Sequence, residues 1–118
     1  ARWNVLAQSV VMSPTNRLPP PEELYWMDDW SGYPAARRRL LAQLAETRAA
    51  NPVVLSGDIH GFMAGELRGD AADPASPIVA TEFVTTSLSS EGTEESLFAT
   101  YLANNPGLRY ATGRWRGY

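Results

Sequence analysis

Runs of apolar residues alternate with polar, proline-rich and glycine-rich segments along this chain. The first run, residues 3–12 (WNVLAQSVVM), is rich in β-branched and aromatic residues and predicts a strand. Four shorter apolar runs predict further strands, at residues 53–56, 62–67, 78–84 and 108–111. The run at 53–56 (VVLS) is short and mostly apolar, which is typical of a buried strand.

Two segments carry the spacing of amphipathic helices. The first is predicted over residues 33–50, because Pro34 suits a first helical turn and Asn51–Pro52 would end the helix. Its apolar stripe is formed by three leucines, Leu40, Leu41 and Leu44. The second helix is predicted over residues 94–103, and we expect Thr93 to cap its first turn.

The predicted elements follow the order β-α-β-β-β-α-β. Because helices and strands alternate only in part, this order favours an α/β layer fold with a mixed sheet over a doubly wound sheet. The length of 118 residues suits one hydrophobic core, so we expect a single domain over residues 1–118. The connection 13–30, which contains four prolines and two tryptophans, is long for so short a chain and favours a functional loop.

Composition and charge exclude several classes of function. The chain has no cysteine, which excludes disulfides and thiolate metal sites. The formal net charge of −3 argues against a surface for nonspecific nucleic-acid binding, which requires a basic face. No apolar run approaches the length of a membrane span, and no charged start followed by an apolar stretch indicates a signal peptide.

The segment Gly57–Gly61 holds the most informative chemistry. It follows the predicted strand 53–56 and contains Asp58 and His60, the only histidine of the chain. Because alternate side chains of an extended segment point the same way, we expect both to project from the carboxyl end of the strand, where α/β sheets bind ligands. One carboxylate and one imidazole supply half of a metal site. The alternative is that Asp58 caps a turn and His60 is an ordinary loop residue.

The other polar residues are predicted to have mainly structural roles. Glu82 lies inside an apolar strand, so its carboxylate must be paired or protonated if buried, and the hydroxyls of residues 85–87 are candidate partners. Asp70 and Asp73 lie among turn-forming residues, and the consecutive arginines 37–39 favour a solvated helix face. The sequence contains neither a G-x-S-x-G elbow nor a phosphate-binding P-loop.

Five segments, taken in order, resemble the alkaline phosphatase D (PhoD-like) family. They are WNVLAQSVVM, MDDWSGYPAARRRLL, NPVVLSGDIHGF, DPASPIVATEFVTTSLSSEG and NPGLRYATGRWRGY. The resemblance covers nearly the whole chain with compatible spacing. It implies a secreted or periplasmic, metal-dependent enzyme that hydrolyses phosphate mono- or diesters, of which this chain is the C-terminal part of the catalytic domain.

The resemblance also implies a fold and a metal centre. The fold is the C-terminal portion of a four-layer α-β-β-α sandwich, as in metallophosphoesterases, with the metal centre at the strand ends. The family centre combines calcium with iron. The family's Gly-Asp-x-His stretch, which supplies metal ligands, matches Gly57–His60, so the ligand role passes to Asp58 and His60. Asp/His ligation by itself is also compatible with zinc or manganese.

Some positions differ from the family pattern, and two other functions stay open. Gly61 stands where the family usually has Ser, and Ser31 where it has Asp. The family's other metal ligands lie upstream, so we expect the chain alone to be an incomplete enzyme, weakly active or inactive. One alternative is a noncatalytic fragment that folds or self-associates through an exposed sheet face. Another is a binding module for a polar ligand or a protein that uses the Pro/Trp loop 19–30.

Overall fold

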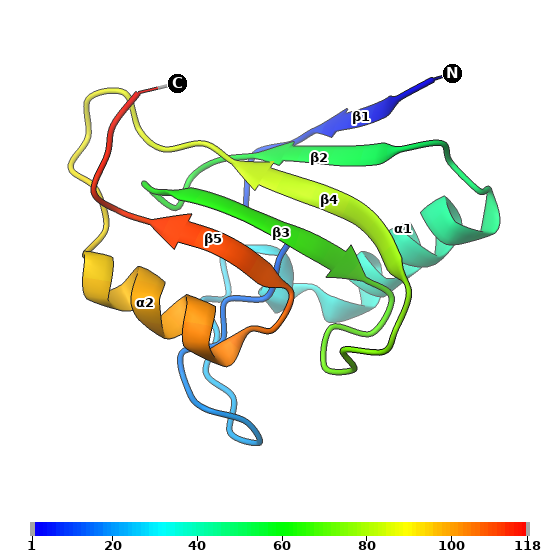
Figure 1. Ribbon diagram of the computed structural model, residues 1–118, viewed down its shortest axis with the longest axis horizontal. Coiled ribbons are helices and arrows are strands. Elements are labelled where there is room, and N and C mark those ends of the chain that lie inside the picture. Colours follow the sequence, from blue (N-terminus) through cyan, green and yellow to red (C-terminus); the bar gives the residue numbers. More distant parts are fainter. Residues whose placement is uncertain (1, 118) are drawn as a thin grey trace.

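The computed structural model describes residues 2–117 and consists of a five-stranded mixed sheet with two helices (Figure 1). The sheet order is β1-β2-β4-β3-β5. The strands are β1 (Asn4–Ala7), β2 (Pro52–Ser56), β3 (Phe62–Arg68), β4 (Ile78–Val84) and β5 (Leu108–Thr112). The helices are α1 (Pro34–Glu46) and α2 (Glu95–Asn104), and a 3-10 turn, η1 (Trp30–Gly32), precedes α1. The predicted α/β class, the mixed sheet and the order of elements are confirmed.

Four of the strands run in one direction. β1 and β4 each pair in parallel with β2, whereas β3 pairs antiparallel with both β4 and β5. Strands β1, β2, β4 and β5 therefore end at the same edge of the sheet, which we call the carboxyl edge. Figure 1 shows the arrowheads of β2, β4 and β5 on this side. The segments that follow these strands are consequently brought close together.

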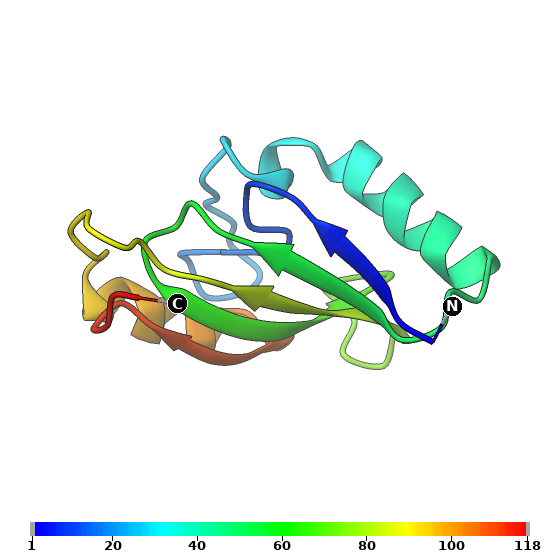
Figure 2. The same ribbon diagram turned by 90° about the horizontal axis from the view of Figure 1, so that it is seen from above.

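Both helices cover the same face of the sheet, the inner face. Met63 and Leu67 of β3 are four residues apart and point the same way, because side chains alternate along a strand. Met63 belongs to a buried cluster with residues of α2, and Leu67 belongs to a second cluster with Leu41 of α1. Val11 and Met12, which follow β1, complete the two clusters. Figure 2 shows α1 on one side of the twisted sheet.

The opposite, outer face of the sheet is open. The outer residues of four strands form a row across it, because Leu55 of β2 pairs with Phe83 of β4, Phe83 with Ala64 of β3, and Ala64 with Tyr110 of β5. The large side chains of this row are 43% (Leu55), 49% (Phe83) and 50% (Tyr110) exposed. The prediction that 53–56 forms a strand is thus right, but only its inner face is buried. An apolar row of this kind is an unpartnered surface.

The first strand is shorter than predicted. Residues 3–12 were expected to form one strand, but β1 ends at Ala7 and Val11 and Met12 turn into the core. The backbone N–H groups of Met12 and Ser13 donate to the Glu82 carboxylate instead of to a neighbouring strand. The buried side chain of Glu82 therefore holds this segment against the inner face. The apolar pattern of the sequence alone does not predict this contact.

The helix boundaries also differ from the prediction. Helix α1 ends at Glu46 and not at residue 50. The Thr47 hydroxyl donates a hydrogen bond to the carbonyl of Gln43, and Arg48 has a positive φ of 49°, which ends the helix. Thr93 does not cap α2, as its hydroxyl donates to the carbonyl of Ile59. No helix within residues 2–117 has the length and apolar character needed to cross a membrane.

Candidate active site at the carboxyl edge

A cavity of about 280 Å³ opens at the carboxyl edge of the sheet. Its walls come from three segments that are far apart in the sequence. The segment after β1 contributes one wall, the loop after β2 another, and the residues at the start and middle of α2 the third. The lining side chains are those of Val11, Arg17, Trp26, Asp29, Asp58, Ile59, His60, Thr93, Leu97 and Tyr101. The two residues predicted as metal ligands, Asp58 and His60, therefore share one cavity.

The backbone around Asp58 and His60 is not extended. Asp58 has a φ of 74° and His60 a φ of 57°, so both occupy the left-handed region that non-glycine residues rarely adopt. The predicted strand-like alternation is wrong, and the two side chains line the cavity because the chain coils tightly after Gly57. Strained backbone of this kind persists where the surroundings impose it, and it clusters at functional sites.

The loop that carries His60 is tied to the loop that precedes α2. Thr93 donates its backbone N–H to the His60 carbonyl over 3.1 Å and its hydroxyl to the Ile59 carbonyl over 2.8 Å. The His60 ring lies with Nδ1 3.0 Å from the carbonyl oxygen of Glu91. A carbonyl can only accept, so this contact requires a proton on Nδ1 and leaves Nε2 as the nitrogen that can bind a metal ion. Backbone contacts of this type orient the histidines that bind metals.

Asp58 and His60 fit a metal as two ligands and no more. Asp58 is exposed, and Nε2 of His60 has no hydrogen-bond partner among residues 2–117. One oxygen and one nitrogen can therefore coordinate a hard or borderline cation. Within residues 2–117 no group of three or more His, Cys, Asp and Glu side chains is arranged to hold a metal ion. Asp58 and His60 therefore do not form a complete metal centre by themselves.

Arg17 and Asp29 also line the cavity, although the sequence analysis assigned them no role, whereas Trp26 belongs to the Pro/Trp loop 19–30 considered there as a binding module. The Arg17 guanidinium lies over the Trp26 ring, 5.6 Å from its centroid. Asp29 is buried and its oxygens accept from the backbone N–H of Ser31 at 2.6 Å and from the hydroxyl of Thr15 at 3.2 Å. Burial raises the pKa of Asp29, and these hydrogen bonds act in the opposite direction. The only signal in the sequence was the length and tryptophan content of the connection 13–30.

Gly61 lies where the packing leaves no room for a side chain. A Cβ at this position would lie 2.1 Å from Cζ of Phe98 and 2.8 Å from the carbonyl oxygen of Thr112. The Phe98 ring, which is fully buried, occupies the space that a serine side chain would need. A larger residue at position 61 would therefore require the packing of α2 against the loop to change.

Trp30 and Gly32 show the local role of residues 30–34 (WSGYP), which join the connection 13–30 to α1. A Cβ on Gly32 would lie 2.1 Å from the Met27 carbonyl oxygen, so only glycine permits this close approach. The Trp30 indole donates to Oε1 of Gln8 over 3.1 Å and packs against the cluster that includes Leu41. The stretch thus links the end of the long connection to the start of α1.

Glu82 is buried and fully partnered, as its position in an apolar strand required. One oxygen accepts the backbone N–H of Met12 and the other that of Ser13, each over 2.7 Å. The hydroxyl of Ser56 also donates to it, so the predicted partners at 85–87 are not the ones used. Its carboxylate is withdrawn into the inner face and is not among the residues that line the cavity.

Arg37 corrects the prediction of a solvated arginine face. It is only 7% exposed and donates Nε to the Met12 carbonyl over 2.8 Å, whereas Arg38 and Arg39 are exposed. Burial lowers the pKa of Arg37, and the negative charge of Glu82 opposes that shift. The predicted turn role of Asp70 and Asp73 is confirmed, because each carboxylate accepts a backbone N–H two residues on.

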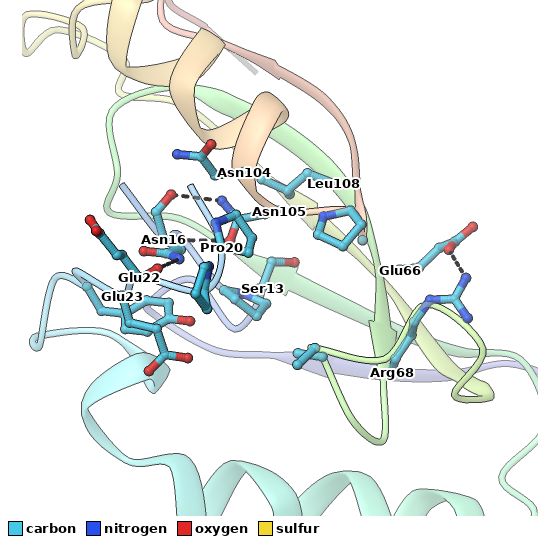
Figure 3. Close-up of a pocket in the computed structure, with 17 residues that line it drawn as sticks. Ser13, Asn16, Pro20, Glu22, Glu23, Glu66, Arg68, Asn104, Asn105 and Leu108 are labelled. Carbon is cyan, nitrogen blue, oxygen red and sulfur yellow. Dashed lines mark hydrogen bonds and ion pairs between the residues drawn. The ribbon is translucent and has the colours of Figure 1, made fainter. Parts of the chain in front are cut away.

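A second cavity, of about 330 Å³, lies away from Asp58 and His60 (Figure 3). It is bordered by the connection 13–30, by the β3–β4 loop and by the turn after α2. Two hydrogen bonds between Asn16 and Asn105 join two of these segments. The Asn16 backbone N–H donates to Oδ1 of Asn105 over 2.9 Å, and Nδ2 of Asn105 donates to the Asn16 carbonyl over 3.1 Å. Glu22 and Glu23 line it on one side and the Glu66–Arg68 ion pair on the other, and neither Asp58 nor His60 is among its lining residues.

Comparison with known proteins gives consistent results. The family model described as "PhoD-like phosphatase" matches residues 1–118. The protein "Alkaline phosphatase D" of Bacillus subtilis (strain 168) is 36% identical over 121 residues, covering all of this chain and 21% of the relative. A solved structure, "Structure of PhoD", superposes with a TM-score of 0.89 at 35% sequence identity, covering all of this chain and 23% of that one. The chain thus spans about a fifth of the length of the relatives it matches.

Proposed function

This chain belongs to the PhoD-like phosphatase family, and on that premise we propose that it forms part of a metal-dependent enzyme that hydrolyses phosphate mono- or diesters. The observation that supports the proposal is the cavity at the carboxyl edge, where Asp58 and His60 lie on one wall with open donor atoms. The proposed centre contains calcium and iron, with zinc or manganese as alternatives that the same donors accept.

The residues of this chain would bind and orient the reacting groups. A metal centre, when bound, polarises a phosphoryl oxygen and activates a water or hydroxide for in-line attack. Asp58 would contribute a carboxylate oxygen and His60 its Nε2 to that centre. The Glu91 carbonyl holds the His60 ring in the required tautomer, and Thr93 fixes the backbone beneath it. Val11, Leu97 and Tyr101 supply the apolar part of the cavity lining.

The proposed enzyme is larger than this chain. Two side chains cannot satisfy a calcium ion, which takes six to eight oxygen ligands. The remaining ligands would come from residues beyond the 118 described by the sequence, in keeping with the fifth of the relatives' length that the chain spans. A secreted or periplasmic location is part of the same proposal and rests on the family resemblance.

Activity and metal content of the full-length protein test the ligand roles. We expect Asp58→Asn and His60→Ala each to lower phosphoesterase activity at least ~100-fold and to lose bound metal, because both remove a donor without touching the core. The matched control is Asp28→Asn, an exposed carboxylate outside the cavity, which should retain both properties. Near-normal rates and metal content in the Asp58 and His60 variants would contradict the assignment.

A second candidate is a noncatalytic chain that self-associates, and the outer face of the sheet favours it. The row of Leu55, Phe83 and Tyr110 is an apolar surface that a second copy can cover. Sedimentation of the purified chain should then show dimers or larger species, and Phe83→Lys should shift them to monomers. A monomer with a cooperative melt and no dependence on concentration would contradict self-association.

A further inference from the structure

We propose that Arg17 binds a non-bridging phosphoryl oxygen of the substrate, a phosphate ester, in the cavity that Asp58 and His60 line. The proposal rests on the proposed function and adds a residue that the family resemblance did not assign. Arg17 lies in the segment after β1, whereas Asp58 and His60 follow β2, so the fold brings them to one cavity from two different segments.

The guanidinium has a donor that the chain leaves unused. Nε of Arg17 is buried and has no hydrogen-bond partner within the part of the chain that the structure describes. A buried N–H without a partner is costly, and most such groups in proteins are satisfied by protein, water or ligand. A phosphate oxygen entering the cavity would satisfy this donor.

Contacts within the chain position the Arg17 side chain to bind an anion. The Arg17 backbone N–H donates to the Leu24 carbonyl over 2.9 Å, and the guanidinium rests on the Trp26 ring. Stacking of this kind fixes the guanidinium plane while leaving its edge free for hydrogen bonds. The planar fork of arginine matches two oxygens of a phosphate, which a lysine ammonium does not.

The charges in the cavity favour the same role. Arg17 is the one arginine or lysine among the lining residues of this cavity within residues 2–117. The carboxylate of Asp29 accepts hydrogen bonds from Ser31 and Thr15, and the nearby Arg17 charge also acts to lower the pKa of Asp29, although Arg17 makes no hydrogen bond to it. Arg17 therefore offers the fixed positive charge that a phosphate ester meets beside the proposed metal ligands.

Kinetics and phosphate binding of the full-length protein test the proposal. Arg17→Met keeps the length and apolar contact of the side chain but removes its charge and donors. We expect Arg17→Met to raise KM for a phosphate ester and the inhibition constant for inorganic phosphate by about 10- to 100-fold, with unchanged metal content. Arg17→Lys, which retains the charge without the fork, should fall between the two proteins.

The controls separate this inference from the proposed function. Arg38→Met, on the exposed side of α1, should leave both constants unchanged. Constants within twofold of wild type in Arg17→Met would overturn the role of Arg17 while hydrolysis by the wild type stands. A wild type without hydrolysis would overturn the proposed function alone, because calorimetric titration of wild type and Arg17→Met with inorganic phosphate still tests Arg17. Equal phosphate affinity of the two proteins would then overturn the inference as well.

Discussion

Glu82 of β4 and Asp58, which follows the neighbouring parallel strand β2, are two carboxylates that differ in burial, in hydrogen bonding and in backbone conformation. Glu82 lies within β4, is fully buried and accepts hydrogen bonds from two backbone N–H groups and a hydroxyl. Asp58 lies beyond the end of β2, is exposed, and its carboxylate makes no hydrogen bond to the residues that the structure describes. The first has a strand conformation, whereas the second is in the left-handed region.

The difference shows how a carboxylate committed to the fold is distinguished from one that can bind a ligand. A buried carboxylate is tolerated only when its oxygens are satisfied, and the partners of Glu82 leave no place for a cation. An exposed carboxylate on strained backbone contributes little to stability and keeps its oxygens free. Substitutions at the two positions should therefore separate stability from activity.

Removing the Glu82 carboxylate should have the largest effect on stability. Glu82→Leu leaves the N–H groups of Met12 and Ser13 and the Arg37 charge without a partner, and we expect a loss of about 4 kcal/mol in the free energy of unfolding. Glu82→Gln, which keeps the shape and one acceptor oxygen, should lose roughly half as much. Urea unfolding of the purified chain measures both, and an unchanged midpoint for Glu82→Leu would break the comparison.

The buried Arg37 should show the next largest effect. Arg37→Met removes the charge that faces Glu82 and the donor to the Met12 carbonyl, and we expect a loss of about 3 kcal/mol. Arg38→Met, one residue along the same helix but exposed, should change stability by less than about 0.5 kcal/mol. Equal losses in the two variants, measured by thermal unfolding, would contradict the burial of Arg37.

Backbone strain at Asp58 should give a smaller effect that distinguishes two otherwise similar variants. Asp58→Gly and Asp58→Ala both remove the carboxylate and should lose metal to the same extent. Only glycine adopts a φ of 74° without cost, so Asp58→Gly should be more stable than Asp58→Ala by about 1 kcal/mol. If the two variants unfold at the same urea concentration, the turn does not impose this conformation on the chain.

The pH dependence of a surface carboxylate provides the smallest effect. The hydrogen bond from Arg109 at 2.9 Å, aided by Arg68 at 2.6 Å, lowers the pKa of Glu66 below its usual value of 4.5. The folded state therefore favours the ionised form, and this stabilisation is present above about pH 4.5 and is lost as the pH falls through the lowered pKa. Glu66→Gln should flatten the decline of stability in that acidic range, as measured by unfolding at a series of pH values.

Local pattern was sufficient to predict most of the fold. The apolar runs identified all five strands, and helical spacing located both helices, with Pro34 marking the start of α1. These signals succeed because the inner face of each element must be apolar wherever it packs. The segment Gly57–Gly61 was also predicted as the place of the candidate site, since a strand end followed by glycine and polar residues has a recognisable composition.

What the pattern missed depends on contacts between distant residues. Arg37 is buried because Glu82, forty-five positions along the chain, supplies the opposing charge. Arg17 enters the cavity only because the connection 13–30 folds back to the end of β2. The early end of β1 has the same origin, because Glu82 takes backbone N–H groups that the apolar run suggested for the sheet. The local sequence around these residues does not predict contacts with partners so far along the chain.

The topology of the sheet has a consequence for the order in which the chain folds. The β3–β4 hairpin joins residues as close as Arg68 and Ile78, whereas β1 and β2 pair residues as distant as Asn4 and Pro52. Contacts between distant residues form slowly, because a long loop must be closed before they contribute. We expect the hairpin to form first and the cavity, which needs three distant segments, to form last. Pulse-labelled hydrogen exchange that protects β1 before β3 would contradict this order.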